Sequence, residues 1–503
     1  MSLRLHNTLT RTVEPFVPVH AGRVSLYTCG PTIYNYAHIG NFRTFLFEDL
    51  LRRWLEASGY DVFHIMNLTD VDDRTIAAAR DKGVSLRQHV DPFARAFEED
   101  RDWLRILPPT EQPRATEYIG PMIELIQGLL DRKVAYLGED GSVYFAIARF
   151  PAYGRLSQLD RRQLRAGASE RVSADEYSKE DARDFVLWKA ARPEDEAVGA
   201  AWDAPFGRGR PGWHIECSAM ALELLRRRTG TDVLDIHAGG VDLIFPHHED
   251  EIAQSCAFTG RDEFARVWMH GEFLNIRGEK MSKRFGNITT ARDLREDGVD
   301  PGAVRLLMFQ VHYRKQLDLT DEALASAREG SRRLGEFQNR LLAAAGSSDG
   351  PSLVGAADRL ERELADAMDD DLNAPRAVAA LFAFASTGNA ALDAGEAAGP
   401  RALAAWRRAD GVLAVTSTVH AVKVETSAKS ETDGSEELAP APPVGADGEV
   451  QRSWAVRWAV RRKDAKAARN YAEADRIRAL LKGAGWEVRD NRDGSIEVVR
   501  GQS

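Results

Sequence analysis

The sequence predicts an α/β protein whose doubly wound parallel sheet is divided by an inserted domain and followed by helices. Residues 23–66 have a strand–helix–strand pattern, the unit from which parallel sheets are built. The sheet pattern returns near residue 234 with the apolar run "VLDIHAGGVDLIF". A chain of 503 residues is too long to form a single hydrophobic core. We therefore expect about three to five domains.

The first sheet unit can be justified element by element. "RVSLYTCG" is a short apolar run typical of a buried strand. Apolar side chains from Phe42 to Leu55 recur at helical spacing, and Gly59 follows them as a stop signal. "DVFHIMNLTD" then predicts a second buried strand. Because nucleotides bind such sheets beyond the carboxyl ends of the strands, we expect a site there.

After the first sheet unit, the sequence pattern alternates between helical segments and predicted strands, which indicates further domains. Residues 85–135 are largely helical, and an Ala/Leu/Arg/Glu-rich pattern from residue 301 predicts a helical bundle. We predict these segments: the first half of the sheet domain over 1–114, an inserted connective domain over 115–208, the second half of the sheet domain over 209–300, the bundle over 301–415, an acidic disordered linker over 416–450, and a basic C-terminal domain of mixed α/β structure over 451–503.

The net charge of −10 hides an asymmetry near the C-terminus. Residues 424–450 carry seven acids and one lysine, which predicts disorder, whereas residues 452–482 carry ten Lys or Arg and three acids. The basic helix fits a nucleic acid, or it is only a solvated charged face. "GWEVRDNRDGSIEVVR" predicts a hairpin that turns at Asp493-Gly494. Trp486 either stacks on a base or forms the core of this small domain.

The composition also bears on the compartment. The chain has no run of 18 apolar residues that would span a membrane, and "MSLRLHNTLTRTVEPF" lacks the apolar core of a signal peptide. We therefore expect a cytoplasmic protein. In a reducing compartment, metal binding or core packing explains the three cysteines Cys29, Cys217 and Cys256 better than disulfides do.

Two motifs that follow predicted strands fit a nucleotide. In "HIGN", His38 and Gly40 lie where a loop enters the first helix, whose free N–H groups suit phosphate. In "KMSKR", Lys280 and Lys283 can close over a triphosphate and stabilise the charge on a leaving pyrophosphate. Either motif alone is more often an ordinary surface loop. Together they favour a nucleotide site.

A second group of residues fits a metal ion. Cys29 ends the first strand, Cys217 lies in "GWHIECSAM", and "FPHHEDE" supplies imidazoles and carboxylates. If a helix starts there, Glu251 shares a face with His247, four residues earlier, or with His248, three residues earlier. Thiolates, an imidazole and a carboxylate suit zinc. The spacing alone leaves open that these are core and capping groups.

The motifs also carry a resemblance. "HIGN" and "KMSKR" resemble the HIGH and KMSKS signatures of class I aminoacyl-tRNA synthetases, which activate an amino acid with ATP on a Rossmann-type fold. With "YTCGPTIYNYAHIGN", "GWHIECSAM" and "DIHAGGVDLIFPHHEDEIAQS", the chain is similar to the cysteinyl-tRNA synthetases over nearly its whole length. It departs at Asn41, which replaces the second histidine, and at Arg284, which replaces the final serine.

The resemblance implies ATP-dependent ligation of L-cysteine to tRNA(Cys) through a cysteinyl adenylate, with one Zn²⁺ per chain and Mg²⁺ bound with ATP. Zinc would select the thiolate, because apolar pockets discriminate near-isosteres poorly. The residues implied are, for catalysis, His38, Lys280 and Lys283; for ATP binding, the same three with Gly40 and Asn41; for the substrate, Gly30, Thr69, Trp213, His237 and Asp242; and for zinc, Cys29, Cys217, His247 and Glu251. Cys256 is assigned to helix packing. The bundle and the C-terminal domain would bind tRNA, and we expect a monomer that binds no membrane.

Two other functions remain open. A related ligase that joins activated cysteine to an amino sugar would lack a C-terminal domain that reads tRNA, so residues 451–503 argue against it. A non-enzymatic tRNA- or zinc-binding protein that kept the fold would not need His38, Lys280 and Lys283 intact.

Overall fold

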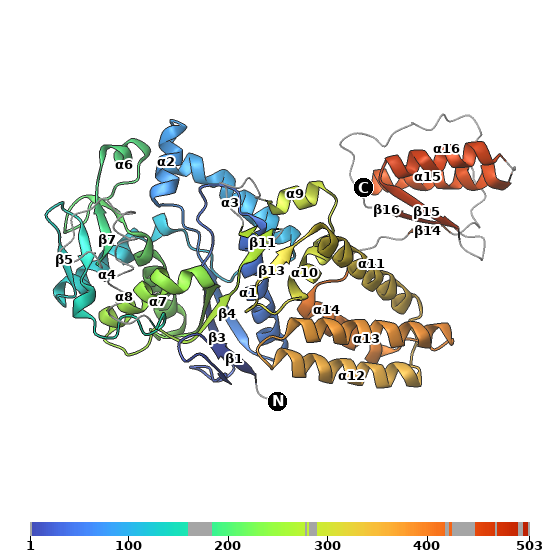
Figure 1. Cartoon of the computed structure of the whole chain (residues 1–503), viewed down its shortest axis with the longest axis horizontal. Helices are drawn as coiled ribbons and strands as arrows, with labels where there is room; N and C mark the ends of the chain where they lie inside the picture. Colours follow the sequence, from blue (N-terminus) through green and yellow to red (C-terminus); the bar gives the residue numbers. More distant parts are fainter. Residues whose placement is uncertain are drawn as a thin grey trace.

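The computed structural model describes residues 3–158, 184–276, 279–280, 289–417, 422–424, 448–467, 470–490 and 496–500. The chain leads from a body built on a sheet, through a bundle of long helices, to a small C-terminal unit at the upper right of Figure 1. None of the helices in the described ranges combines the length and apolarity that a membrane crossing requires.

The central sheet has four parallel strands in the order β10-β9-β3-β4. Nearly every residue of these strands is buried, as expected for a parallel sheet with both faces covered. This confirms the predicted α/β fold. The bounds are β3 (Arg23–Thr28), β4 (Asp61–Met66), β9 (Leu234–Gly240) and β10 (Ala265–Gly271), and the helices that follow β3, precede β9 and follow β9 are α1 (Ile39–Ala57), α7 (Trp213–Thr229) and α8 (Glu249–Thr259).

Between β4 and α7 the chain adds helices and a separate antiparallel sheet of order β5-β6-β7-β8. Its last strand crosses the predicted boundary at residue 208, because Pro211 pairs with Trp188 and extends the inserted sheet to residue 211. The elements are α2 (Asp73–Asp81), α3 (Leu86–Trp103), α4 (Ile119–Asp131), β5 (Ala135–Leu137), β6 (Val143–Phe145), β7 (Phe185–Ala190), α6 (Pro193–Val198) and β8 (Gly209–Pro211).

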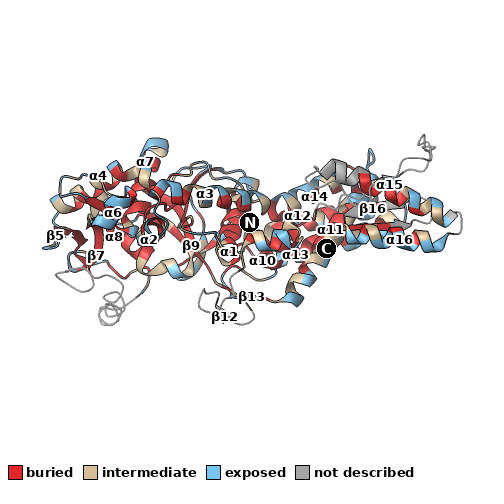
Figure 2. Ribbon diagram, turned by 90° about the horizontal axis from the view of Figure 1, so that it is seen from above, coloured by how far each residue is buried: buried red, intermediate tan, exposed pale blue. Residues whose placement is uncertain are grey.

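Long helices follow the sheet domain, and their buried positions face one another and the body (Figure 2). Among the described residues, one hydrophobic core has members from Leu3 to Val415, so the bundle and the body pack as one unit. The elements are β1 (Arg4–Asn7), β2 (Thr12–Pro15), β11 (Leu274–Ile276), β12 (Glu279–Lys280), α9 (Ala291–Glu296), α10 (Pro301–Phe309), β13 (Leu317–Leu319), α11 (Asp321–Ala343), α12 (Pro351–Met368), α13 (Ala374–Asp393) and α14 (Pro400–Leu413).

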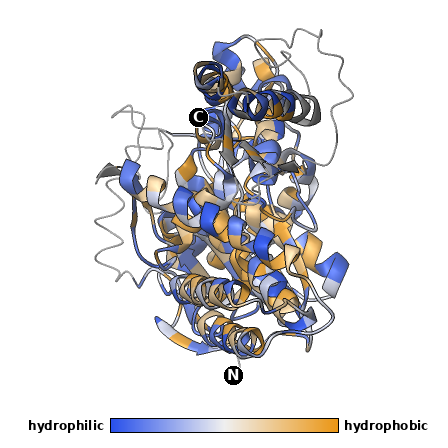
Figure 3. Ribbon diagram, turned by 90° about the vertical axis from the view of Figure 1, so that its right-hand side faces the viewer, coloured by the Kyte–Doolittle hydropathy of each residue, from blue (hydrophilic) through white to orange (hydrophobic). Residues whose placement is uncertain are grey.

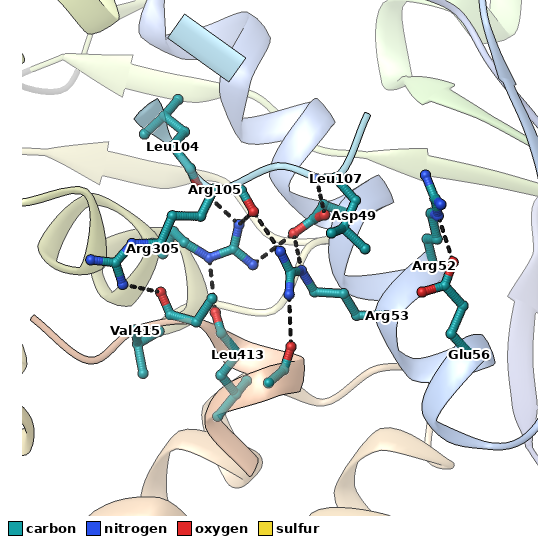
Figure 4. A network of polar contacts seen from close by, with 12 residues as sticks. Asp49, Arg52, Arg53, Glu56, Leu104, Arg105, Leu107, Arg305, Leu413 and Val415 are labelled. Carbon is teal, nitrogen blue, oxygen red and sulfur yellow. Dashed lines mark hydrogen bonds and ion pairs between the residues drawn. The ribbon is translucent and has the colours of Figure 1, made fainter. Parts of the chain in front are cut away.

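A buried polar junction joins the end of the bundle to α1 (Figure 4). Arg305 of α10 is fully buried and donates to the Leu413 carbonyl at 2.9 Å and to Asp49 Oδ2 at 2.7 Å. Arg53 donates to the same Asp49 oxygen at 2.7 Å and to the Gly411 carbonyl at 2.8 Å. Asp49 therefore holds two arginines that both bind backbone carbonyls of α14.

The C-terminal unit has a core of its own, in which α15 and α16 pack on the sheet of order β14-β16-β15. Figure 3 shows both hydrophilic and hydrophobic residues on the described parts of its helices. Trp486 is 4% exposed in this core, so it is a packing residue and not a stacking platform. The bounds are β14 (Val422–Val424), α15 (Gly448–Ala467), α16 (Tyr471–Gly483), β15 (Trp486–Asp490) and β16 (Ile496–Arg500).

The predicted hairpin and the predicted linker differ in how well they agree with the structure. The strands of the hairpin are present and antiparallel, while its turn lies outside the described residues. Residues 416–450 are not a continuous linker: Val422–Val424 pairs with β16, and α15 already begins at Gly448. The alternating pattern Val-Lys-Val suits a strand, but the acidic composition around it hides this short signal.

Candidate active site

The ends of β3 and β9 define the candidate site. β3 pairs with β4 on one side and with β9 on the other, so the strand order reverses between β3 and β9. Ligands of open parallel sheets bind at such a reversal, beyond the carboxyl ends of the strands. Cys29 directly follows β3, and Gly240 is the last residue of β9.

His38 and Asn41 cap the start of α1. The His38 Nδ1 atom accepts the Asn41 N–H at 3.2 Å, and the Asn41 Oδ1 atom accepts the His38 N–H at 3.1 Å. Burial lowers the pKa of His38, although Asp242 acts in the opposite direction. A neutral His38 whose Nδ1 accepts carries its proton on Nε2, which makes Nε2–H a hydrogen-bond donor.

A cavity of about 150 Å³ lies at this helix start. It brings together four of the residues predicted to bind ATP or substrate, namely His38, Gly40, Asn41 and Asp242, with residues from β9, the end of β10 and β11. A larger cavity of about 750 Å³ lies at the amino ends of β3 and β4. Because ligands of parallel sheets bind at the carboxyl ends, the smaller cavity is the nucleotide candidate.

The lysines of "KMSKR" are only partly described. The backbone of Lys280 is in β12, opposite Asn275 of β11. The preceding residue of β11, Leu274, lines the cavity that contains His38. Lys283 and Arg284 lie outside the described residues.

The predicted metal ligands converge in the core, where Cys29 directly follows β3 at the same edge of the sheet as the cavity. The Cys29 and Cys217 sulfurs lie 4.0 Å apart, and Cys29 Sγ lies 3.9 Å from Glu251 Oε1. His247 Nε2 lies 3.1 Å from the same Glu251 oxygen. One ligand atom from each of these four residues falls within 4.8 Å of all the others, and all four residues are buried.

A second set overlaps the first. His237 and His248 also form a compact group with Cys29 and Glu251, and His248 Nε2 lies 3.4 Å from Cys29 Sγ. The other ring nitrogen of His248 meets His270 Nε2 at 2.8 Å. The first set has two sulfur donors and the second has one. Because soft thiolates suit zinc, the donor chemistry favours the set with Cys217 and His247.

The charges in the first set fit a cation. Although burial opposes it, His237 and His247 lower the pKa of Glu251 to about 2. The hydrogen bond from Cys29 lowers the pKa of Cys217 to about 6. Burial raises the pKa of Cys29 well above its usual value. Although burial opposes it, Glu251 and Cys217 raise the pKa of His247 to about 10, so a protonated His247 balances these negative charges in the ion-free cluster. The donor set of two sulfurs, an imidazole and a carboxylate fits a zinc ion, which would supply the positive charge once His247 gives up its proton and becomes a ligand.

The predicted substrate residues lie around this cluster. The Trp213 ring stacks on His247 with centroids 4.4 Å apart, and it is 39% exposed. His237 Nε2 donates to Glu251 Oε2 at 3.0 Å, and its ring stacks on Trp268. The Thr69 hydroxyl is buried and accepts from the side chain of Asn67.

Close packing explains why position 30 is a glycine. A Cβ atom at this position would lie 1.7 Å from the Asn67 carbonyl oxygen, so any side chain would force β3 and the chain after β4 apart. The Gly30 N–H also donates to Asn67 Oδ1 at 3.0 Å. Glycine is thus required for close packing at the mouth of the site, next to Cys29.

Our sequence reasoning missed the polar groups behind the ligands. His214 Nδ1 lies 3.0 Å from His247 Nδ1, and His270 Nδ1 lies 2.7 Å from the Thr8 hydroxyl. Such partners orient the imidazoles that hold a metal. The signal for His214 was its place three residues before Cys217 on one helix, whereas Thr8 is brought in from a distant part of the chain.

The sequence matches known protein families that share this fold. The family model described as tRNA synthetases class I (C) catalytic domain matches residues 15–329, more than half of the chain, and the DALR domain model matches residues 363–415. The fold and the site are therefore those of a class I tRNA synthetase. A cysteine–tRNA ligase of Chlamydia pneumoniae is 43% identical over 497 residues, covering 98% of this chain and 97% of the relative. One of Thermosynechococcus vestitus is 43% identical over 502 residues, covering 99% of each. The chain belongs to the cysteine–tRNA ligase family, as the motifs predicted.

A solved structure agrees with the fold. Methionyl-tRNA synthetase of Mycobacterium tuberculosis, in complex with methionyl-adenylate, superposes with a TM-score of 0.55 at 17% sequence identity. The match covers 78% of this chain and 90% of that chain. At this identity the likeness concerns the fold alone.

Proposed function

We propose that the protein ligates L-cysteine to tRNA(Cys) at the expense of ATP, through a cysteinyl adenylate. The main supporting observation is that a buried cluster of two cysteines, a histidine and a glutamate lies at the same edge of the sheet as a cavity at the start of α1. The cluster suits a thiol substrate, and the cavity suits a nucleotide. The names of the relatives support the substrates.

His38 and the start of α1 would bind ATP, together with Mg²⁺. The Nε2–H of His38 points a donor at the phosphates, and the positive end of the helix dipole favours their charge. Gly40 and Asn41 would form the wall of the nucleotide site, and Lys280 and Lys283 would stabilise the leaving pyrophosphate. The protein needs no nucleophile of its own for this step, because positioning and electrostatics suffice.

Cys29, Cys217, His247 and Glu251 would hold one zinc ion. When bound, zinc supplies a ligand position with a strong preference for a thiolate over a neutral hydroxyl. Trp213 would cover the site through its contact with His247, while Thr69, His237 and Gly30 would shape the pocket for the amino acid. Asp242, beside His38, would bind the substrate amine or the ribose.

The tRNA would be bound outside the sheet domain. The DALR domain match lies in the bundle, and the basic helices of the C-terminal unit carry positive charge that fits an RNA backbone. We further propose that the protein acts as a monomer in the cytoplasm.

The decisive experiment measures transfer of labelled cysteine onto total tRNA, with ATP and zinc-loaded protein. Charged tRNA is the expected product. Adenylate formation without charged tRNA would favour the ligase that joins cysteine to an amino sugar. Absence of both products, together with absence of pyrophosphate exchange into ATP, would contradict the proposal and favour a binding protein.

A further inference from the structure

The loop before "HIGN" presents an exposed aromatic ring at the rim of the candidate site. Tyr36 is 49% exposed, although large aromatic side chains bury most of their surface in a folded chain. It precedes His38 by two residues. His38 in turn forms an isolated β-bridge with Thr290, the residue that caps α9. Tyr36 therefore stands next to the nucleotide cavity and next to the start of α9.

The ring of Tyr36 is held in place from two sides. The Arg292 guanidinium lies over one face of the ring, 5.3 Å from its centroid, and the Phe93 ring stands perpendicular to it with centroids 5.1 Å apart. About half of the surface of Tyr36 remains exposed beside these two contacts. Arg292 is itself fixed, because it donates to Glu99 at 2.6 Å and to the Ala96 carbonyl at 3.2 Å. These bonds join α9 to α3, which lie side by side at the top of Figure 1. The exposed ring is thus a rigid surface.

Two neighbouring aromatic rings also have a cation over them. The Lys82 ammonium lies 5.3 Å from the Phe93 centroid, and the Arg74 guanidinium lies 5.6 Å from the Tyr34 centroid. Together with Arg292 over Tyr36, three aromatic rings each carry a cation. Arg292 is already paired with Glu99 and Asp100, so the positive charge that this patch offers to phosphates comes from Arg74 and Lys82. We call Tyr34, Tyr36, Phe93 and their three cations the rim patch.

We propose that the rim patch binds the unpaired 3′-terminal nucleotides of tRNA, with Tyr36 as the ring on which a base stacks. Unpaired RNA is recognised by stacking on aromatic rings while nearby cations bind its phosphates, and the rim patch offers both. The position fits, because the acceptor ribose must reach the adenylate beside His38. The inference rests on the proposed function and names the surface that its second step uses.

The test separates the two steps of the reaction. Tyr36→Ala, Tyr36→Phe and the wild type are compared for cysteine-dependent pyrophosphate exchange, which needs no tRNA, and for charging of tRNA. Leu137→Ala is the control, since Leu137 is 55% exposed on the inserted sheet and outside the rim patch. We expect Tyr36→Ala to lower kcat/KM for tRNA about 10-fold or more, with exchange unchanged. Tyr36→Phe should retain charging, because it keeps the ring.

A binding measurement keeps the inference testable if the wild type charges no tRNA. A labelled stem-loop RNA with four unpaired 3′ nucleotides is compared with the same stem lacking them. The wild type should bind the first more tightly, and Tyr36→Ala should remove that difference. Equal losses in exchange and charging would place Tyr36 at adenylate formation and overturn the inference. Unchanged charging and unchanged RNA binding in Tyr36→Ala would also overturn it.

Discussion

Replacing Arg305 by methionine should destabilise the whole main body of the protein. The side chain is fully buried and donates to four acceptors on three segments of the chain: the carbonyls of Leu104, Arg105 and Leu413 and the carboxylate of Asp49. Methionine keeps much of the volume but no donor. Asp49 would retain its bonds from Arg53 and from the Leu107 N–H.

The magnitude follows from the groups left behind. Two buried carbonyls would lose a donor, at about 1–3 kcal/mol each, and a buried carboxylate would lose one of its two cationic partners. Removing one partner of a buried ion pair costs about 3–5 kcal/mol. Because the losses at the carbonyls add to the loss at Asp49, which keeps Arg53 as a partner, we expect Arg305→Met to lower the free energy of unfolding by about 5 kcal/mol or more.

Native-state hydrogen exchange of peptides from α1 and α14 is the suitable assay, because it reports on the main body separately from the C-terminal unit. Arg52→Met is the matched control on α1. Arg52 pairs with Glu56, one turn away and 39% exposed, at 2.8 Å (Figure 4), and it also donates to the Pro108 carbonyl. Such a pair contributes about 1 kcal/mol or less. If Arg305→Met changed the opening free energy no more than Arg52→Met does, the junction would not couple α1 to α14.

Two further predictions concern buried groups of the sheet. Burial and Arg52 lower the pKa of His64 to about 3, below the ordinary value near 6.5. The unfolded chain then takes up the proton first as the pH falls. Stability should therefore decrease by about 1.4 kcal/mol per pH unit from pH ~6.5 to ~3, a component that His64→Gln should lack in urea unfolding at several pH values. Separately, Cys217→Ser should lose bound zinc, measured by elemental analysis after gel filtration, whereas Cys256→Ser should keep it, because Cys256 belongs to neither ligand set. Equal pH slopes in wild type and His64→Gln, or full zinc content in Cys217→Ser, would refute these expectations.

Much of the site could be predicted because its residues sit next to strand ends and helix starts. A buried strand followed by "CGPT" and a helix after "HIGN" place Cys29 and His38 at one edge of the sheet by topology alone. The spacing of His247 and Glu251 predicts a shared helical face, and the two residues do meet at 3.1 Å. Local patterns are sufficient where a motif and its element coincide.

The remainder depends on contacts between distant segments. The choice between His247 and His248 required the position of Cys217, which no spacing reveals. The β14 strand has three residues and gains its partner only from Ile496–Arg500, beyond the whole C-terminal helix pair. The Arg305 junction joins residues more than 100 positions apart, so a charged residue in an apolar helix pattern gave no sign of its partner.

The two separate hydrophobic cores have a consequence for how such a chain can change. Within the described residues, the core that ends at Val415 and the core around Trp454, Trp458 and Trp486 share no member. The C-terminal unit can therefore be replaced as a whole, because cutting the chain between the two cores exposes the apolar residues of neither core. Substitutions in the C-terminal unit can then accumulate without disturbing the packing around the candidate active site.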